Sequence, residues 1–449
     1  KNNKYKTVYA DRQADPTGIA LSGNEGSGRA CYIGSDFNIK GIGRTCLVKN
    51  PKDSLHGSGT LDLITALREA IMSNFIYKYT NIGTSPVIAV LALKDKTKYE
   101  WCDYPLRNAL LIRLDKGSLD RISHLAYAPL VKRTVSFNDI LIKYAIFDAE
   151  MFAHRLLHGA WSTGNASLNG QWIDMESISF IKGRGARCSI TKKYVSNYFG
   201  YESFGIKQAI DQLADVLDLS LKRNKWESRF NQIREERLTY ETLRLLGLNL
   251  REIPEIINIF PESSNLAREF EFLAKKISPR KADLGVFGNN FAGTHLLDFS
   301  RLFRILPSIY SQNINLQKMQ SYLLRKNELH QCKIRKYHPD NMAEEYLASH
   351  AVIEGEKEVK KVIKRTEKFL KLLVQFINKL NKKSFLPKRK EWKLNATAAN
   401  RNYPNFDQLT TIIRDYVEKY KKHKISAQEL NKKINSILLP PFSRTNSEN

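Results

Sequence analysis

The architecture of this chain follows most directly from the stretch Ala30-Cys-Tyr-Ile-Gly-Ser-Asp-Phe-Asn-Ile-Lys40. It holds two short runs of β-branched and aromatic residues on either side of Gly34-Ser35, which is typical of a β-hairpin. The hairpin places Lys40 on a strand. We therefore expect the chain to begin with a strand-rich unit that carries a lysine on its sheet.

A glycine-rich stretch, Gly23-Asn-Glu-Gly-Ser-Gly-Arg29, comes directly before this hairpin. Backbone N–H groups can approach a phosphate closely only where side chains are absent, so Gly23, Gly26 and Gly28 suit a phosphate-binding turn. On this interpretation Lys40 faces whatever the turn holds. A flexible loop is the alternative reading of the same glycines.

A strand lysine near a phosphate usually has a carboxylate partner that fixes its long side chain. The segment from Thr60 to Met72 has the apolar spacing of a helix and contains Glu69. The sequence therefore predicts an ion pair between Lys40 and Glu69. Each residue alone also fits an ordinary solvated position.

Two oxygen ligands follow later in the chain. Asn165 and Asp174 are nine residues apart, and the Asn-Gly turn within Leu168–Ile173 returns the chain from one to the other. Amide and carboxylate oxygens suit a divalent cation that also binds phosphate oxygens. The arrangement matches the catalytic and metal loops of the protein-kinase fold, so we predict a site for ATP and Mg²⁺.

These pieces, taken in order, resemble the selenoprotein O family of kinase-like AMP-transferases. The family pattern comprises two phosphate turns, a Lys-Gly-x-Gly-x-Thr stretch, Ile-Arg-Glu, Met-x-Arg, a His-Gly-x-x-Asn-Thr-Asp-Asn loop and an Asp-Tyr-Gly metal loop. The matching pieces here are Gly23–Arg29, Lys40–Thr45, Gly57–Gly59, Leu67–Glu69, Leu111–Arg113, His158–Asn165 and Trp172–Asp174.

The resemblance implies a role for each matched residue. Gly26, Gly28, Arg29 and Lys40 would contact the nucleotide phosphates, with Glu69 orienting the lysine. Gly59 would lie in the second phosphate turn, Arg113 would neutralise a terminal phosphate, and Asn165 and Asp174 would hold the metal. In this family AMP, rather than a phosphoryl group, passes to a protein hydroxyl.

The second phosphate turn departs from the family pattern. Ser58 and Thr60 stand where the family has aspartate and arginine, and the second family arginine falls on Asp120 with Arg121 next to it. Arg121 is therefore our candidate for that phosphate contact.

The catalytic position departs as well. The family's catalytic aspartate is Gly164 here, and the Asp-Tyr-Gly loop has become Asp174-Met-Glu176. A positioned base typically contributes about a hundredfold to ten-thousandfold in rate. Its loss points to nucleotide binding without catalysis, or to altered chemistry in which Glu176, Asp148 or the substrate supplies the base.

Composition limits the class of protein. The 449 residues suffice for two or three domains, and the formal net charge of +26 favours anionic partners. Five scattered cysteines without a C-x-x-C motif argue against a disulfide framework or zinc site. No run approaches the length of a membrane helix. We expect a cytoplasmic protein without membrane association.

The predicted fold class is α+β, with a kinase-like bilobal architecture. Residues 1–132 form a strand-rich N-lobe, 133–335 a mostly helical C-lobe, and 336–449 a basic helical C-terminal region. Lys357–Lys383 reads as a long amphipathic helix with a lysine-rich outer face, while Gly285–Gly293 reads as a loop. His154 and His158 read as packing histidines, because Arg155 stands where a zinc-hydrolase helix carries glutamate.

Three functional classes remain open. The first is an ATP- and Mg²⁺-dependent nucleotidyltransferase, or an ATP-dependent ligase or transferase subunit, with a protein or peptide acceptor. The second is a regulatory pseudokinase. Under this class the chain also loosely resembles the maturation proteins of siderophore microcins, which work with an acyltransferase-like partner. The third, a nucleic-acid binder, rests on charge alone and lacks a recognisable module.

Overall fold

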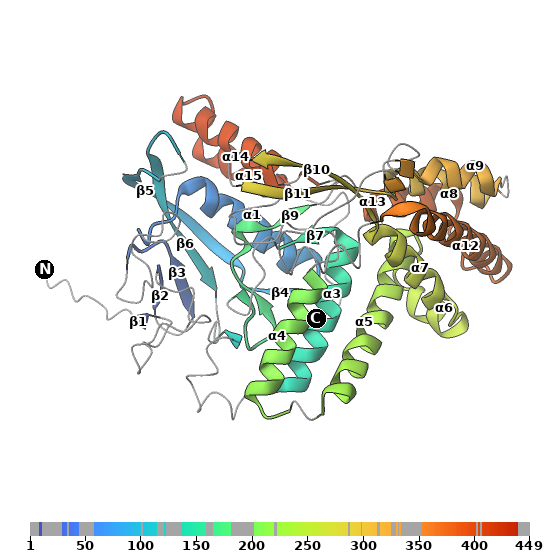
Figure 1. Ribbon diagram of the computed structural model, residues 1–449. Coiled ribbons are helices and arrows are strands. Elements are labelled where there is room, and N and C mark those ends of the chain that lie inside the picture. Colours follow the sequence, from blue (N-terminus) through green and yellow to red (C-terminus); the bar gives the residue numbers. More distant parts are fainter. Residues whose placement is uncertain are drawn as a thin grey trace, which may run out of the picture.

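The computed structural model describes most of the chain. The residues described are 9–10, 29–33, 36–44, 58–99, 102–114, 121–122, 136–158, 165–180, 202–219, 222–285, 288–297, 299–311, 315–324, 329–330, 332–333, 353–400, 403–404 and 406–438. They form a mixed α+β structure in which an antiparallel sheet lies at one end and packed helices lie at the other (Figure 1).

The main sheet has, among the described residues, five antiparallel strands in the order β1-β2-β3-β6-β5. The predicted hairpin is confirmed, because β2 pairs with β3 in the register Ala30↔Lys40. The strands are β1 (Tyr9–Ala10), β2 (Ala30–Ile33), β3 (Phe37–Lys40), β5 (Val87–Thr97) and β6 (Leu106–Leu114).

Strand β3 lies inside the sheet, next to β6, and opposes Asn38 to Arg113 and Lys40 to Leu111. Since residues two apart on a strand point to the same face, Lys40 and Arg113 share one face of the sheet. That face is covered by α1 (Leu63–Tyr79), whose Ala66 and Ala70 pack with Leu111 of β6.

Helix α1 begins where its sequence supplies a cap. The carboxylate of Asp62 accepts hydrogen bonds from the backbone N–H groups of Ile64 and Thr65, each at 3.0 Å. Such caps satisfy donors that have no partner inside the helix. The helix predicted within Thr60–Met72 is therefore confirmed, and it extends further, to Tyr79.

A buried helix, α3 (Phe137–His154), leads into the loops that approach the sheet. It ends at Arg155, which adopts a left-handed conformation with φ of 55°. The short elements that follow are β7 (Leu156–Leu157), β8 (Gln171–Trp172), the 3-10 helix η3 (Met175–Ser177) and β9 (Ser179–Phe180). β8 pairs in parallel with β4 (Gly83–Thr84), and β7 pairs with β9. These pairings join the segment 165–180 to the residues that follow α1 and to those that follow α3.

The rest of the chain is largely helical, as the sequence predicts. The helices α4 (Glu202–Val216) and α5 (Arg223–Leu245) flank α3, and α12 matches the predicted amphipathic helix. The sequence pattern also predicts Ile363 on the apolar side of this helix, and that prediction is wrong because the side chain is 38% exposed. The remaining helices are α6 (Ile253–Ile259), α7 (Ser263–Lys275), α8 (Phe299–Tyr310), α9 (Leu316–Leu323), α12 (Gly355–Lys382), α13 (Arg389–Ala399), α14 (Phe406–Lys421) and α15 (Ala427–Ser436).

The loop predicted for Gly285–Gly293 is wrong. The backbone there forms an antiparallel hairpin of β10 (Ile277–Gly285) and β11 (Gly288–His295), which closes with Gly285 opposite Gly288. Glycine and asparagine are depleted in strands, so the composition of this stretch did not indicate a strand. The two strands nevertheless pair through backbone hydrogen bonds.

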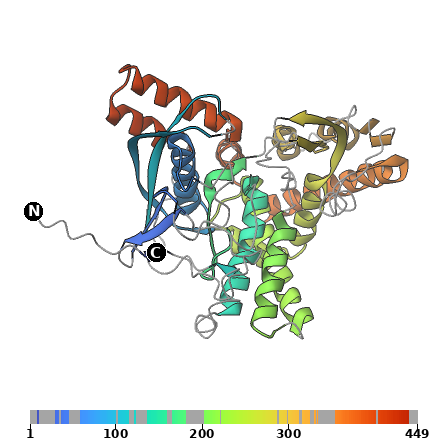
Figure 2. The same ribbon diagram turned by 60° about the vertical axis from the view of Figure 1, so that its left-hand side comes forward.

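The last two helices return to the sheet end of the molecule. Figures 1 and 2 both show α14 and α15 beside α1 and β5, away from α12. Leu409, Ile413 and Val417 of α14 belong to the same apolar core as Phe75 and Ile76 of α1. The helices α12 and α13 instead join α7 in a second core.

Candidate functional site

Lys40 lies at the centre of a buried cluster of charged side chains. Its Nζ is 2.8 Å from Oε2 of Glu69 on α1 and 2.9 Å from Oε2 of Glu176 in η3, and it also contacts Oδ1 of Asp174. The lysine side chain is only 5% exposed. The predicted ion pair between Lys40 and Glu69 is therefore confirmed, and two further carboxylates share the same ammonium.

Two arginines complete the cluster from the sheet side. Arg29 Nη2 donates to both carboxylate oxygens of Glu176, at 3.1 and 3.2 Å. Arg113 Nη1 lies 3.4 Å from Oε1 of Glu69 and is buried behind it. Buried charges are stable only when they are paired, so the three carboxylates and three cations hold one another in place.

Asp174 adopts an unusual backbone conformation. Its φ of 65° and ψ of 55° lie in the left-handed region, which non-glycine residues seldom occupy except Asn, Asp and His. Strained conformations of this kind gather at functional sites. The conformation puts the carboxylate on Lys40 while the chain turns directly into η3.

The charges of the cluster reinforce one another. Burial alone lowers the pKa of the Lys40 ammonium, but attraction by Asp174, Glu176 and Glu69 exceeds this effect and raises the pKa above its ordinary value. Burial likewise raises the pKa of Asp174, while the nearby charges of Lys40, Arg29 and Arg121 hold it well below its usual range. Lys40 and Asp174 are therefore both charged at neutral pH.

His158 anchors the loop that carries Asp174. Burial lowers its pKa to about 4, so the imidazole is neutral at pH 7. Its Nε2 donates to the carbonyl of Ile173 at 2.8 Å, while its own carbonyl accepts from Ser177 Oγ at 2.6 Å. The prediction of a packing histidine is confirmed, and the packing braces both sides of Asp174.

The other predicted residues in the described part of the chain lie around this cluster. The backbone carbonyl of Asn165 accepts a hydrogen bond from Ile173 N, next to Asp174. Arg121 forms a backbone bridge with Ser167 in the same loop. The structure thus brings both predicted metal ligands and Arg121 to one loop.

Gly59, which we predicted in a second phosphate turn, lies against the residues that follow β3. Its φ is +70°, its carbonyl accepts from Gly43 N at 3.1 Å, and a Cβ there would lie 2.2 Å from Arg44 N. Only glycine permits this approach. The neighbouring carbonyl of Thr60 accepts from Arg29 Nη1 at 3.4 Å, which connects the turn to the cluster.

Some of the predicted residues lie elsewhere. Gly26, Gly28 and Gly164 fall outside the described residues. Asp148, one of the two substitutes for the missing base, is buried on α3 and bonds Arg234 Nε of α5 at 2.5 Å. Of the two candidate bases, Glu176 is therefore the one beside Lys40.

Sequence reasoning missed the role of Arg68. Its Nε donates to the backbone carbonyl of Glu176 at 2.5 Å. The residue stands next to Glu69 in the chain, but no local pattern identifies its partners, since one of them is 342 positions away.

The carboxylates of Glu69, Asp174 and Glu176 form the one group of potential metal ligands found among the described residues, with their oxygens within 4.8 Å of one another. Such oxygens suit Mg²⁺. The side chains of Asp174 and Glu176 are 25% and 16% exposed, whereas that of Glu69 is fully buried. A cation from solvent therefore reaches Asp174 and Glu176 first.

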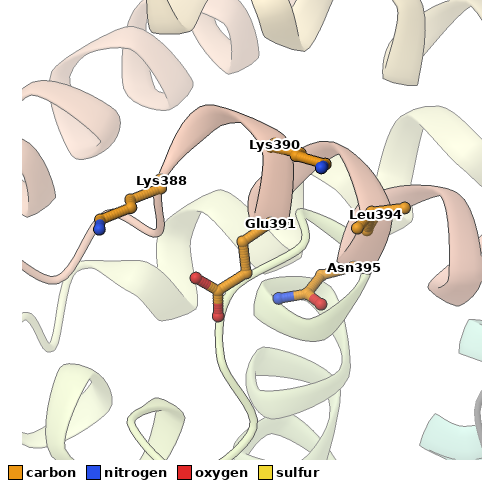
Figure 3. Close-up of a pocket in the computed structure, with 5 residues that line it drawn as sticks. All are labelled: Lys388, Lys390, Glu391, Leu394 and Asn395. Atoms are coloured by element: carbon orange, nitrogen blue, oxygen red, sulfur yellow. The ribbon is translucent and has the colours of Figure 1, made fainter.

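Two hollows on the helical half are separate from this cluster. One, with a volume of about 340 Å³, lies at α13. Figure 3 shows the residues that line it, Lys388, Lys390, Glu391, Leu394 and Asn395. The other, of about 590 Å³, lies along α12 and includes Arg365 and Leu372. Both are open to solvent and basic, and neither contains a residue of the charged cluster.

No protein-family model matches the chain, and no curated protein matches it significantly. In the part of the chain that the structure describes, no helix combines the length and the apolar character needed to cross a membrane. The geometry of the cluster is therefore the basis for the functional argument.

Proposed function

We propose that the cluster around Lys40 is a nucleotide site and that the chain binds ATP with Mg²⁺ in a protein-kinase-like fold. One observation carries the proposal: a strand lysine contacts both a helix glutamate and a loop aspartate. Kinases use this set of three, in which the glutamate orients the lysine toward the phosphates and the aspartate binds Mg²⁺. Here Lys40, Glu69 and Asp174 fill these positions.

The order of elements supports the same proposal. The lysine strand β3, the glutamate helix α1 and the strands β5 and β6 precede a helical region, and the aspartate loop follows α3. In a bilobal reading the sheet with α1 is the N-lobe, and α3 with the helices beyond it is the C-lobe. The cluster then joins the lobes, since β3 and η3 both contribute to it.

The charges present suit a nucleotide that arrives with a metal ion. Arg29 and Arg121 supply positive charge beside Asp174, and such charge stabilises phosphate oxygens. Asp174 and Asn165 are the residues that would hold Mg²⁺, with Glu176 adjacent. When bound, the ion neutralises charge on the phosphates.

The proposed reaction takes account of the missing catalytic aspartate, which is Gly164 in this chain. Gly164 supplies no side chain where a base would stand, so we propose slow or altered transfer of AMP to a protein or peptide acceptor. In such a transfer, an acceptor hydroxyl oxygen bonds the α-phosphorus and pyrophosphate leaves. Glu176, beside Lys40, is the carboxylate placed to take the hydroxyl proton.

Titration calorimetry with ATP and Mg²⁺ tests binding. The informative variant is Asp174→Asn, because asparagine tolerates the left-handed backbone that this position requires. We expect it to weaken binding at least tenfold, whereas Asp211→Asn on α4, which makes the same chemical change in an exposed ion pair, leaves affinity unchanged. Absence of binding to the wild type, or equal affinity of all three proteins, would refute the proposal.

ATP labelled at either the α- or the γ-phosphate distinguishes the possible reactions. AMP transfer labels an acceptor protein from the α-labelled nucleotide only, and Glu176→Gln then reduces the labelling further. Labelling from the γ-phosphate identifies a phosphoryl transferase instead. Binding without labelling in either case identifies a regulatory nucleotide-binding protein.

A further inference from the structure

Arg68 connects the candidate site to the far end of the chain. It occupies the position on α1 directly before Glu69 and is buried, with 6% exposure. Neighbouring residues on a helix point about 100° apart, so the two side chains leave α1 in different directions. Glu69 reaches the sheet and Lys40, while Arg68 reaches the loop of η3.

The guanidinium of Arg68 bonds two elements at once. Its Nε donates to the carbonyl of Glu176 at 2.5 Å, and its Nη1 donates to Thr410 Oγ1 of α14 at 2.9 Å. The guanidinium carbon also lies 3.9 Å from the centre of the Phe406 ring, a distance that suits a cation–π contact. Planar arginine is suited to combine directed hydrogen bonds with stacking.

A second contact ties the same two elements together. The backbone N–H of Phe406 donates to Ser179 Oγ at 3.0 Å, in β9 just beyond η3. The segment that carries Asp174 and Glu176 is thus linked to the start of α14 at two points, directly through Ser179 and indirectly through Arg68. The apolar face of α14 packs in the core that includes α1, which keeps this first turn in place.

We propose that α14 is a structural part of the nucleotide site and that Arg68 is the positioning residue through which it acts. Arg68 fixes the carbonyl of Glu176, and hence the path of the Asp174–Ser177 loop, and Phe406 and Thr410 of α14 help to hold its guanidinium in place. This inference rests on the proposed function for its effect on nucleotide affinity, whereas the effect on the loop does not depend on it.

Adjacent threonines on α14 provide a matched pair of variants. Thr410 and Thr411 both donate a hydrogen bond to a carbonyl within the helix, but only Thr410 also accepts from Arg68. Valine keeps the shape of threonine and removes the hydroxyl. Thr410→Val therefore removes the Arg68 contact, Thr411→Val serves as its control, and Thr410→Ser restores the acceptor.

Two measurements are made on the full chain. Hydrogen exchange of the amides at 175–178 should become at least fivefold faster in Thr410→Val, and faster again in Phe406→Leu, but not in Thr411→Val or Thr410→Ser. The affinity for ATP with Mg²⁺ should fall about three- to tenfold in the same two variants.

The outcomes separate the two proposals. If the wild type does not bind ATP but exchange at 175–178 responds as described, the proposed function fails and the coupling through Arg68 stands. If the wild type binds ATP while Thr410→Val matches Thr411→Val in both measurements, the coupling is refuted. Phe406→Leu provides the same test if Thr410→Val does not fold.

Discussion

At the scale of single residues, the site depends on balanced charge. Lys40 contacts all three carboxylates in a place from which water is largely excluded, and Arg29 and Arg113 supply the other two positive charges that balance them. Removing one partner of a buried ion pair leaves the other charge uncompensated, which costs more than the pair itself contributes. The sign of each charge is therefore as important as its contacts.

Lys40→Met should destabilise the protein by about 3–5 kcal/mol, the loss typical of a broken buried pair. Adding Asp174→Asn to this variant removes one of the unpaired carboxylates and should restore part of the stability. Urea unfolding of the two variants measures both effects. A double variant less stable than Lys40→Met would contradict the charge balance described here.

Two glycines in the backbone close to the end of β3 provide a second prediction at the residue scale. Gly43 and Gly59 both have positive φ, but a Cβ at Gly43 meets no described atom within 4 Å, whereas one at Gly59 meets backbone at 2.2 Å. Gly43→Ala should thus cost only the strain of the left-handed conformation, about 1–2 kcal/mol. Gly59→Ala should cost more and also weaken nucleotide binding. Equal losses in urea unfolding would contradict the close approach.

Acid stability depends on His158. Its pKa is about 6.5 in the unfolded chain and about 4 when buried, so the unfolded state binds the proton more tightly. Stability is therefore lost as the pH falls from about 6.5 towards 4, by roughly 3 kcal/mol. His158→Gln retains a donor for Ile173 but does not titrate, so its unfolding free energy should vary less over this range. Identical pH dependence in both proteins would contradict the assignment.

Contacts between single residues of the site were the features best predicted from the sequence. A lysine on a strand near glycines required a carboxylate, and the helix pattern around Glu69 supplied one. Arg68 was not predictable in this way, because its partners Phe406 and Thr410 meet it only through tertiary packing.

At the scale of elements, α14 matters beyond its own stability. Ile413 is fully buried in the core shared with α1, while its neighbour Ile412 is only half-buried. Ile413→Ala should cost about 2–5 kcal/mol, as for other large-to-small changes in a core, and Ile412→Ala less. Because α14 braces α1, the first variant should also speed amide exchange in α1. Unchanged exchange in α1 would show that the two helices are independent.

Elements with regular apolar periodicity were predicted well, as the β2–β3 hairpin and α12 show. The β10–β11 hairpin was missed because its strands lack the alternation that marks a strand and include residues with low β propensity. This hairpin is formed by backbone pairing, which the pattern of side chains does not indicate.

At the scale of the whole molecule, the two large apolar cores share the helices α3 and α5. Helix α3 contributes Phe147 to the core that contains α1 and Phe152 to the core that contains α12. Helix α5 likewise contributes Phe230 to the first core and Leu243 to the second. The sheet end and the helical end are therefore joined by continuous helices rather than by a linker.

Because α3 and α5 belong to both cores, we predict that the two ends of the molecule unfold together. Fluorescence and far-ultraviolet circular dichroism should report one coincident transition in urea, the usual sign of two-state behaviour. ATP with Mg²⁺ should raise the unfolding free energy by about 2.7 kcal/mol at a ligand concentration one hundred times Kd. The transition should therefore move to a higher urea concentration. Two separate transitions, with ATP acting on neither, would contradict both the shared cores and the site.

We propose above all that the charged cluster around Lys40 receives the phosphates of a nucleotide. A crystal structure with a non-hydrolysable ATP analogue and Mg²⁺ measures this most directly. We predict phosphate oxygens within hydrogen-bond distance of Lys40 Nζ and Arg29, with Mg²⁺ bound by Asp174. A nucleotide bound elsewhere, with Lys40 still holding Glu69, Asp174 and Glu176 as it does now, would contradict it.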